Sequence, residues 1–279
     1  MALESLSAIC GISSAVAWGA GDFSGGLASR KSNEFTVVLF SQLIGALFLV
    51  GLVLFSAENT PSMKALIFGA IGGGCGAIGL AALYRAFVHG RMGIVAPVSA
   101  VITAIMPIVF TFFNQGLPEN IQVIGFALAL AAVWLIAHVK GEAGLNPQEM
   151  ILPVVAGLGF GLYFIFLGLA AEESIAWPLL TARGASLTVV YIFFTIKKDA
   201  GLPSRAQLPL IALTGILDAG GNVLFAVAAH LGRLDISATL SSLYPAITVL
   251  LAWAILKERL VAQQWCGVVV AMVALICIA

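Results

Sequence analysis

Two carboxylates interrupt long apolar stretches of the sequence. Asp22 lies three to four residues after Trp18-Gly19, and Asp218 precedes Asn222 by four residues, which places that pair on one face of a helix. Either carboxylate could bind a cationic solute or exchange a proton. The alternative for Asp22 is a helix-end residue beside Arg30, and the alternative for Asp218 and Asn222 is an interhelical hydrogen bond that holds packing alone.

Three prolines within apolar stretches have serines nearby. Pro97, Pro107 and Pro245 each lack an amide proton, so they kink a helix and free backbone carbonyls. Freed carbonyls at membrane depth are tolerated where they line a cavity. We therefore interpret these stretches as cavity walls, with Ser99 and Ser241 as hydrogen-bonding groups for a substrate. The alternative is that the prolines only shape the packing.

Aromatic residues accompany these polar groups. Trp18, Phe160 and Tyr163 form one expected set, which Tyr84 and Tyr244 could join. Aromatic walls suit an amphipathic or cationic organic molecule. They suit helix packing equally well, so the pattern alone leaves both interpretations open.

The remaining reactive side chains favour structural roles. Arg183 is expected to reach the membrane surface or to pair with a carboxylate, and His89 and His230 are expected to close helices. The four cysteines have no metal-site spacing. No H-E-x-x-H sequence or nucleophile constellation is present. An enzyme is therefore not predicted, and no metal or cofactor is expected.

The composition identifies the environment that must hold these residues. Of the 279 residues, 61% are apolar and 9% are charged, whereas a soluble domain is about 25% charged. A water-soluble or disordered chain is excluded, and so is a nucleic-acid binder, because 13 basic residues balance 13 acidic ones. The apolar residues and 30 glycines would fill about ten membrane spans of about 20 residues.

The apolar stretches have the length of membrane-spanning helices and are continuous rather than alternating, which excludes β-barrel strands. A charge inside such a span costs about 2.5–3.5 kcal/mol on insertion scales, so each one is a functional hypothesis by default. We predict an all-α integral membrane protein with ten helices, over residues 5–27, 35–56, 64–87, 92–114, 120–138, 149–171, 175–196, 207–230, 235–256 and 261–279.

The two halves of the chain are related by an offset of 142 residues. Phe160-Gly161 aligns with Trp18-Gly19, and Gly232-Arg233 aligns with Gly90-Arg91. Five helices per half is an odd number, so the second half must enter the membrane in the opposite orientation, as in many transporters. We expect an inverted repeat with halves 1–139 and 149–279 joined by a linker at 140–148.

Four short motifs resemble one known family. They are Ala17-Trp18-Gly19-Ala20, the region from Tyr84-Arg85-Ala86 to Gly93-Ile94-Val95-Ala96-Pro97, the stretch from Asp235 to Pro245, and Lys257-Glu258-Arg259 with Gln264-Trp265-Cys266-Gly267. They resemble the EamA type of the drug/metabolite transporter superfamily, over essentially the whole chain. One departure is Gly116-Leu117-Pro118-Glu119, where the family usually carries a Glu-Arg-like pair.

The resemblance implies a central cavity between the halves, lined mainly by the spans at 5–27, 64–87, 92–114, 149–171, 207–230 and 235–256. It also implies transport of small metabolites or drugs, often as export, and the inverted repeat leads us to expect secondary active transport. The expected partners are the lipid bilayer, a small-molecule substrate and the proton as a coupling ion, with no nucleic acid, in a monomer or a homodimer. A passive channel and a membrane-embedded enzyme are the alternative functions.

Positive charge is distributed unevenly between the two membrane faces. The loops after the first, third, fifth, seventh and ninth spans hold ten lysines and arginines, and the opposite face holds only Lys64 and Arg233. Positive residues favour the cytoplasmic side, so the count places both termini outside a plasma (bacterial inner) membrane. The resemblance implies the reverse, with both termini inside.

Overall fold

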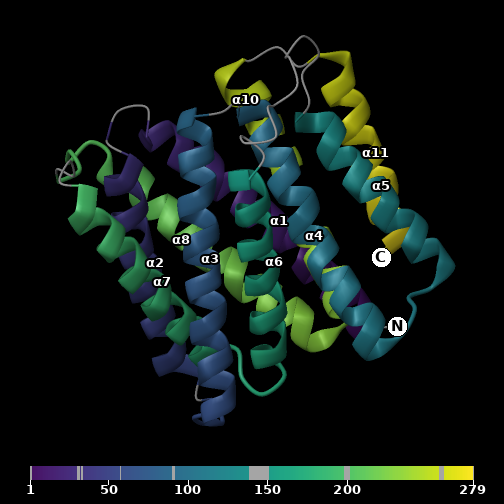
Figure 1. The fold of residues 1–279 in the computed structure, drawn as a ribbon, viewed down its shortest axis with the longest axis horizontal. Coiled ribbons are helices and arrows are strands. Elements are labelled where there is room, and N and C mark those ends of the chain that lie inside the picture. Colours follow the sequence, from purple (N-terminus) through teal and green to yellow (C-terminus); the bar gives the residue numbers. More distant parts are fainter. Residues whose placement is uncertain are drawn as a thin grey trace.

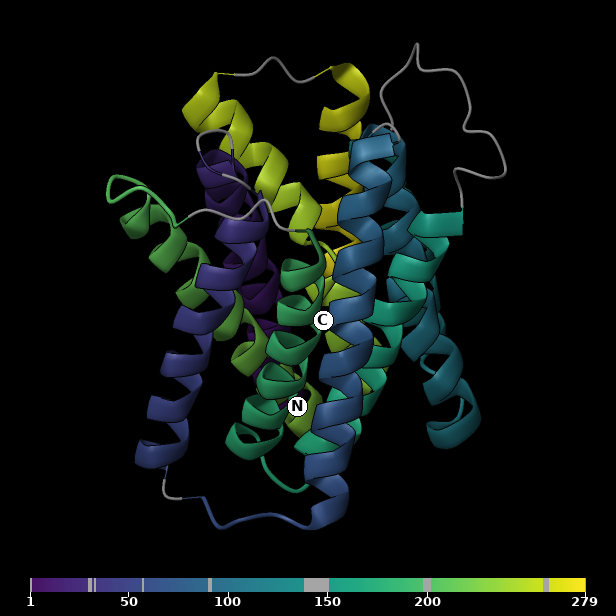
Figure 2. The same ribbon diagram turned by 60° about the vertical axis from the view of Figure 1, so that its left-hand side comes forward.

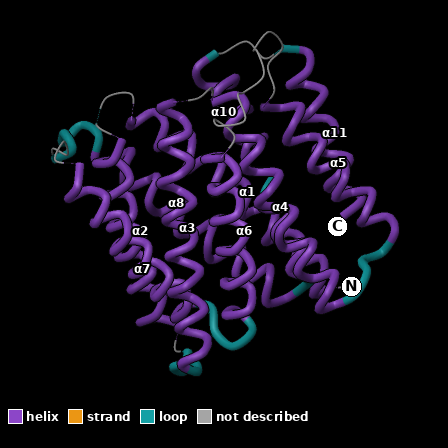
Figure 3. The backbone as a smooth tube through the Cα atoms, viewed as in Figure 1, coloured by secondary structure: helices purple, strands orange, loops and turns teal. Residues whose placement is uncertain are grey.

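The computed structural model describes residues 2–29, 32, 34–56, 58–89, 92–137, 151–197, 202–257 and 261–278. Within these ranges the chain is helical, with short connecting loops and no strand (Figures 1 and 3). The helices are α1 (Ala2–Ser29), α2 (Glu34–Ser56), α3 (Met63–His89), α4 (Met92–Gln115), α5 (Asn120–Ala137), α6 (Ile151–Ala171), α7 (Ala176–Lys197), α8 (Leu208–Leu231), α9 (Leu234–Ser241), α10 (Tyr244–Leu256) and α11 (Ala262–Ile278).

These helices supply ten membrane segments in the described residues. Seven are long and apolar enough to cross a membrane, with α9 and α10 counted as one, and three shorter apolar segments lie in α4, α5 and α11. In lipid the backbone has no water to bond with, so each span must satisfy its own amides as a helix. The predicted all-α membrane fold is confirmed.

The ninth predicted helix, expected at 235–256, is not continuous, although α9 and α10 together form one membrane span. The chain turns at Ser242 and Leu243 between α9 and α10, and Pro245 lies in the first turn of α10. Proline cannot donate to the carbonyl four residues earlier, and its ring collides with that carbonyl. The amide of Ser242 closes α9 by bonding the carbonyl of Ala238 at 2.9 Å.

The two halves interdigitate, so that helices of one half pack against helices of the other. Helix α1 packs along α8 of the second half, and α6 packs along α3 of the first. Likewise α1 contacts α10 as α6 contacts α4, and α2 contacts α8 as α7 contacts α3. Helices α5 and α11 pair at one edge of the molecule (Figure 1). Exchanging the halves preserves every one of these pairings, as an inverted repeat requires.

One repeat-related contact explains why glycine is needed inside two helices. A Cβ atom on Gly221 would lie 2.5 Å from Cδ1 of Trp18, and one on Gly79 would lie 3.2 Å from Cδ1 of Phe160. These two pairs are separated by the offset of 142 residues. In each, an aromatic ring of one half lies directly on a helix of the other, which small residues allow in membranes.

Candidate functional site

An ion pair lies at the centre of the bundle. The guanidinium of Arg183, on α7, contacts the carboxylate of Asp218, on α8, at 2.6 Å, and it also donates to the side chain of Gln42 on α2. Only 6% of the Arg183 side chain is exposed. Gly45 makes room for it, because a Cβ there would lie 3.4 Å from the guanidinium carbon. Arg183 therefore points into the protein and not to the membrane surface.

Hydrogen bonds extend this pair to α1 and α6. The side-chain amide of Asn222 and the indole of Trp18 donate to the backbone carbonyl of Asp218 at 2.7 and 3.3 Å. The hydroxyl of Tyr163, on α6, donates to the side-chain oxygen of Asn222. Side chains from five helices of both halves thus form one polar network, which we call the central cluster: Trp18, Gln42, Tyr163, Arg183, Asp218 and Asn222.

Aromatic rings cover one side of the central cluster. Trp18 stacks on Phe164 with ring centroids 5.5 Å apart and planes 9° apart, and Phe164 stacks on Phe225 at 4.5 Å. Phe225 is fully buried. Phe160, expected in the same aromatic set as Trp18, instead packs against Gly79 on α3.

Asp22 lies on the inner face of α1 and is exposed. Gly19 and Gly21, on either side of this face, pack against α10 and α8, so Asp22 projects between those two helices. On the same face Ala15 is buried, whereas Asp22 and Gly26 are exposed. Among the described residues Asp22 has no hydrogen-bond or ion-pair partner, and its charge is repelled by that of Asp218.

The corresponding face of α6 shows the opposite pattern. Phe164 and Gly168 are the residues 142 positions after Asp22 and Gly26, and both are buried, as is Ala171 at the end of α6. Leu234 of α9 covers Gly168, where an added Cβ would lie 2.5 Å from its Cδ1. The inner space between the halves is therefore open at the C-terminal end of α1 and closed at the C-terminal end of α6.

The short helix α9 fills the closed end. Seven of its residues are buried, Ile236 being the exception, and the carboxylate of Asp235 is paired with Arg233 at 2.9 Å. The hydroxyl of Ser241 donates to the carbonyl of Gly11 at 3.3 Å, which holds α9 against α1. Ser241 is thus used in packing, and it does not face the exposed carboxylate of Asp22.

Loops of opposite halves are tied together at this closed end, which lies at the bottom of Figure 2. The carboxylate of Glu58, in the loop after α2, accepts the hydroxyl of Ser174 at 2.5 Å and the amides of Ile175 and Ala176 at 3.1 Å each. Glu58 therefore caps the N-terminus of α7, which belongs to the other half. We call this set of contacts the loop latch.

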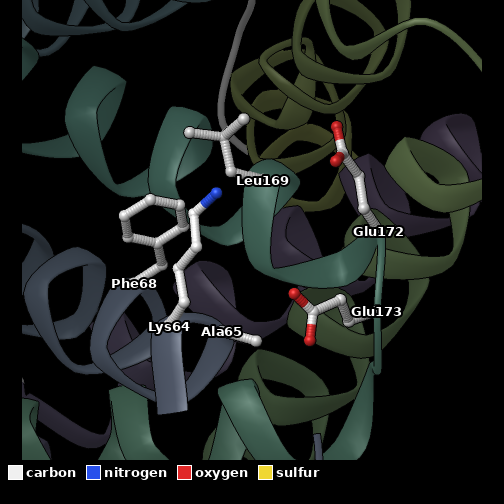
Figure 4. A pocket seen from close by; sticks show the side chains of 6 residues that line it. All are labelled: Lys64, Ala65, Phe68, Leu169, Glu172 and Glu173. Atoms are coloured by element: carbon white, nitrogen blue, oxygen red, sulfur yellow. The ribbon is translucent and has the colours of Figure 1, made fainter. Parts of the chain in front are cut away.

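A second carboxylate reinforces the loop latch. Here the carboxylate belongs to the second half and its hydrogen-bond donors belong to the first half. Glu173, in the loop after α6, accepts the amide and hydroxyl of Ser62 at 3.1 and 2.9 Å, just before α3. These hydrogen bonds hold the pKa of Glu173 below its ordinary value, and the nearby charge of Lys64 lowers it further. Lys64, whose ammonium lies 5.4 Å from the centroid of the Phe68 ring, and Glu173 line a small surface pocket (Figure 4).

The other predicted site residues lie apart from the central cluster. Ser99 is buried on α4, where its carbonyl accepts the hydroxyl of Thr103 at 2.8 Å, and the carbonyl of Tyr244 faces Gly19. Helix α4 runs from Met92 to Gln115 and includes Pro97 and Pro107. The side chains of Tyr84 and Pro97 lie outside the described part of the structure, as do His138 and the predicted linker at 140–148.

Sequence reasoning missed Gln42, Phe164 and Phe225. Gln42 is a polar residue inside an apolar span, so the rule that selected Asp22 would also have selected it. The two phenylalanines carry no such signal among the 17 in the chain. No group of three or more metal-ligating side chains occurs in the residues that the structure describes.

The fold and this site define a class: a multi-pass helical membrane protein of two interlocked repeats with charged groups at mid-membrane. Residues 5–138 and 148–279 each match the EamA-like transporter family. The chain belongs to this family and is a membrane transporter of the drug/metabolite superfamily. A solved structure described only as "Crystal structure of protein" is similar at a TM-score of 0.83 and 13% identity, covering 98% of this chain and 96% of its own. No curated protein matches the sequence.

Proposed function

We propose that this protein is a secondary active exporter of small organic metabolites or drugs in the plasma membrane, working by alternating access between its halves. The observation that carries this proposal is the one-sided opening beside Asp22. An inner face that is exposed in α1 and buried at the equivalent positions of α6 is the arrangement expected when one of two symmetric pathways is closed.

The repeat predicts the structure of the alternative state, in which the two halves exchange their conformations. In the alternative state α6 would expose Gly168 and Ala171, and α1 would bury Asp22 and Gly26. The loop latch and α9 would separate from α6 and α7 to permit this change. Substrate in the central space would then reach each side of the membrane in turn, without a continuous pore.

We propose that the proton is the coupling ion and that Asp22 carries it. An exposed carboxylate without a partner among the described residues can take up a proton without breaking an existing ion pair. Asp218 is less suited to this role, because Arg183 already neutralises it. Asp22→Asn is expected to abolish the dependence of transport on a pH gradient.

The orientation proposed here places the open end in the cytoplasm, following the positive-inside count. A membrane-impermeant maleimide applied outside intact cells should label Thr60→Cys and leave Ser32→Cys unlabelled. Both variants need a background in which the four native cysteines are replaced by alanine. Labelling of position 32 from outside would reverse the orientation.

The transport proposal is tested with purified protein. A thermal-stabilisation screen against metabolites selects a ligand, since a ligand stabilises the state that it binds. That ligand should then show saturable counterflow in proteoliposomes. Flux that rises linearly with concentration and shows no counterflow would identify a passive channel instead.

A further inference from the structure

We infer that the central space takes a monovalent organic cation, an amine held between the carboxylate of Asp22 and the indole of Trp18; this inference rests on the proposed transport function. The balance of charge in the central space favours a cation. Of the mid-membrane side chains that the structure describes, Arg183 is positive, and Asp22 and Asp218 are negative when ionised. The sum is one negative charge, which one cationic group would neutralise.

The positive group of the central cluster already has partners within the protein. Arg183 has 6% of its side chain exposed and contacts both Asp218 and Gln42. Its guanidinium is therefore not free to bind the carboxylate or phosphate of an anionic solute. Asp22, in contrast, is exposed on the inner face of α1 and has no described partner.

The aromatic group next to Asp22 favours an organic cation. Trp18 lies four residues before Asp22, on the same face of α1, and is partly exposed. A carboxylate beside an aromatic ring attracts an organic cation through its charge and through the ring quadrupole. A hard divalent metal ion would need about six to eight oxygen ligands, and no group of three or more metal-ligating side chains occurs in the described residues.

The experiment compares three probes of similar shape and different charge: phenethylamine, phenethyl alcohol and 3-phenylpropionate. Only phenethylamine should raise the unfolding temperature of the full-length protein in detergent. Asp22→Asn should weaken phenethylamine binding at least about tenfold, the effect of losing one close charge pair. Glu119→Gln, which removes a carboxylate from the turn before α5, is the matched control and should bind phenethylamine like the wild type.

A conservative variant keeps the test decisive if Asp22→Asn perturbs folding. Asp22→Glu keeps a carboxylate at the same position of α1 and leaves the Arg183–Asp218 pair intact, so it should still bind phenethylamine and neither of the other two probes. The inference is overturned if no probe stabilises the wild type, if the anion or alcohol binds it as well as the amine, or if Asp22→Asn binds the amine unchanged.

The outcomes separate the substrate class from the transport mechanism. Asp22-dependent amine binding with a linear, unsaturable amine flux would support the cation site and refute alternating access. Saturable counterflow of a neutral or anionic solute, without amine binding, would support the transporter and refute the cation site.

Discussion

Breaking the Arg183–Asp218 pair from either side should have unequal effects on stability. Asp218→Asn leaves the guanidinium, which is 6% exposed, without its carboxylate. Removing one partner of a fully buried pair costs about 3–5 kcal/mol. Because 37% of the Asp218 side chain is exposed and water already weakens the pair, we expect the lower end of that range, about 3 kcal/mol.

Arg183→Gln should cost less, about 1–2 kcal/mol, because the stranded carboxylate is partly hydrated. The double variant leaves two neutral amides that can bond to each other, and it should return to within about 1 kcal/mol of the wild type. The two single costs would then sum to far more than the double cost, giving a large coupling energy.

The assay measures the free energy of unfolding in mixed micelles from the loss of helix content. It compares the wild type, the two single variants and the double variant. Thr188→Val is the control, since Thr188 is exposed on α7 and its hydroxyl donates to the carbonyl of Gly184 in its own helix. The reasoning is refuted if the double variant loses the sum of the two single costs, or if Arg183→Gln is more damaging than Asp218→Asn.

Two further predictions concern packing and pH. Gly221→Ala should lower the free energy of unfolding by about 1–3 kcal/mol, since the added Cβ would lie 2.5 Å from Trp18. Gly79→Ala should lower it by less. Equal losses of unfolding free energy in the two variants would contradict this prediction. Glu173 has a lowered pKa in the folded state, so its contribution is present above its ordinary pKa of 4.5 and is lost as the pH falls through the folded value. The stability difference between the wild type and Glu173→Gln should therefore shrink in acid, and a difference that grows as the pH falls would show that the sign is wrong.

The number and positions of the spans could be predicted because lipid imposes a simple rule on every backbone group. The inverted repeat was also readable, since five helices per half forces the second half to reverse. The break between α9 and α10 could be predicted only in part from the sequence. Proline predicted a disturbance, but whether the chain kinks or separates into two helices depends on how α9 packs against α1 and α6.

The most informative signal for the candidate site was a polar side chain inside an apolar span. Asp218 and Asn222 were selected by this signal and lie in the central cluster, and Asp22 lies exposed beside it. Ser241 was misleading, because its hydroxyl donates to the backbone carbonyl of Gly11 and so holds α9 against α1. Phe160 was grouped with Trp18 through the repeat, although repeat-related residues lie in opposite halves and need not meet.

Alternating access is tested most directly by labelling both ends of the inner space in one background. With the native cysteines replaced by alanine, Gly26→Cys should react quickly with maleimide and Ala171→Cys slowly. Adding Glu58→Ala removes a helix cap worth about 1 kcal/mol, which is a shift of about fivefold between the two states. We expect labelling at 171 to rise and labelling at 26 to fall, whereas the same background with Glu119→Gln should leave both unchanged. Rates that rise together at both positions would contradict it.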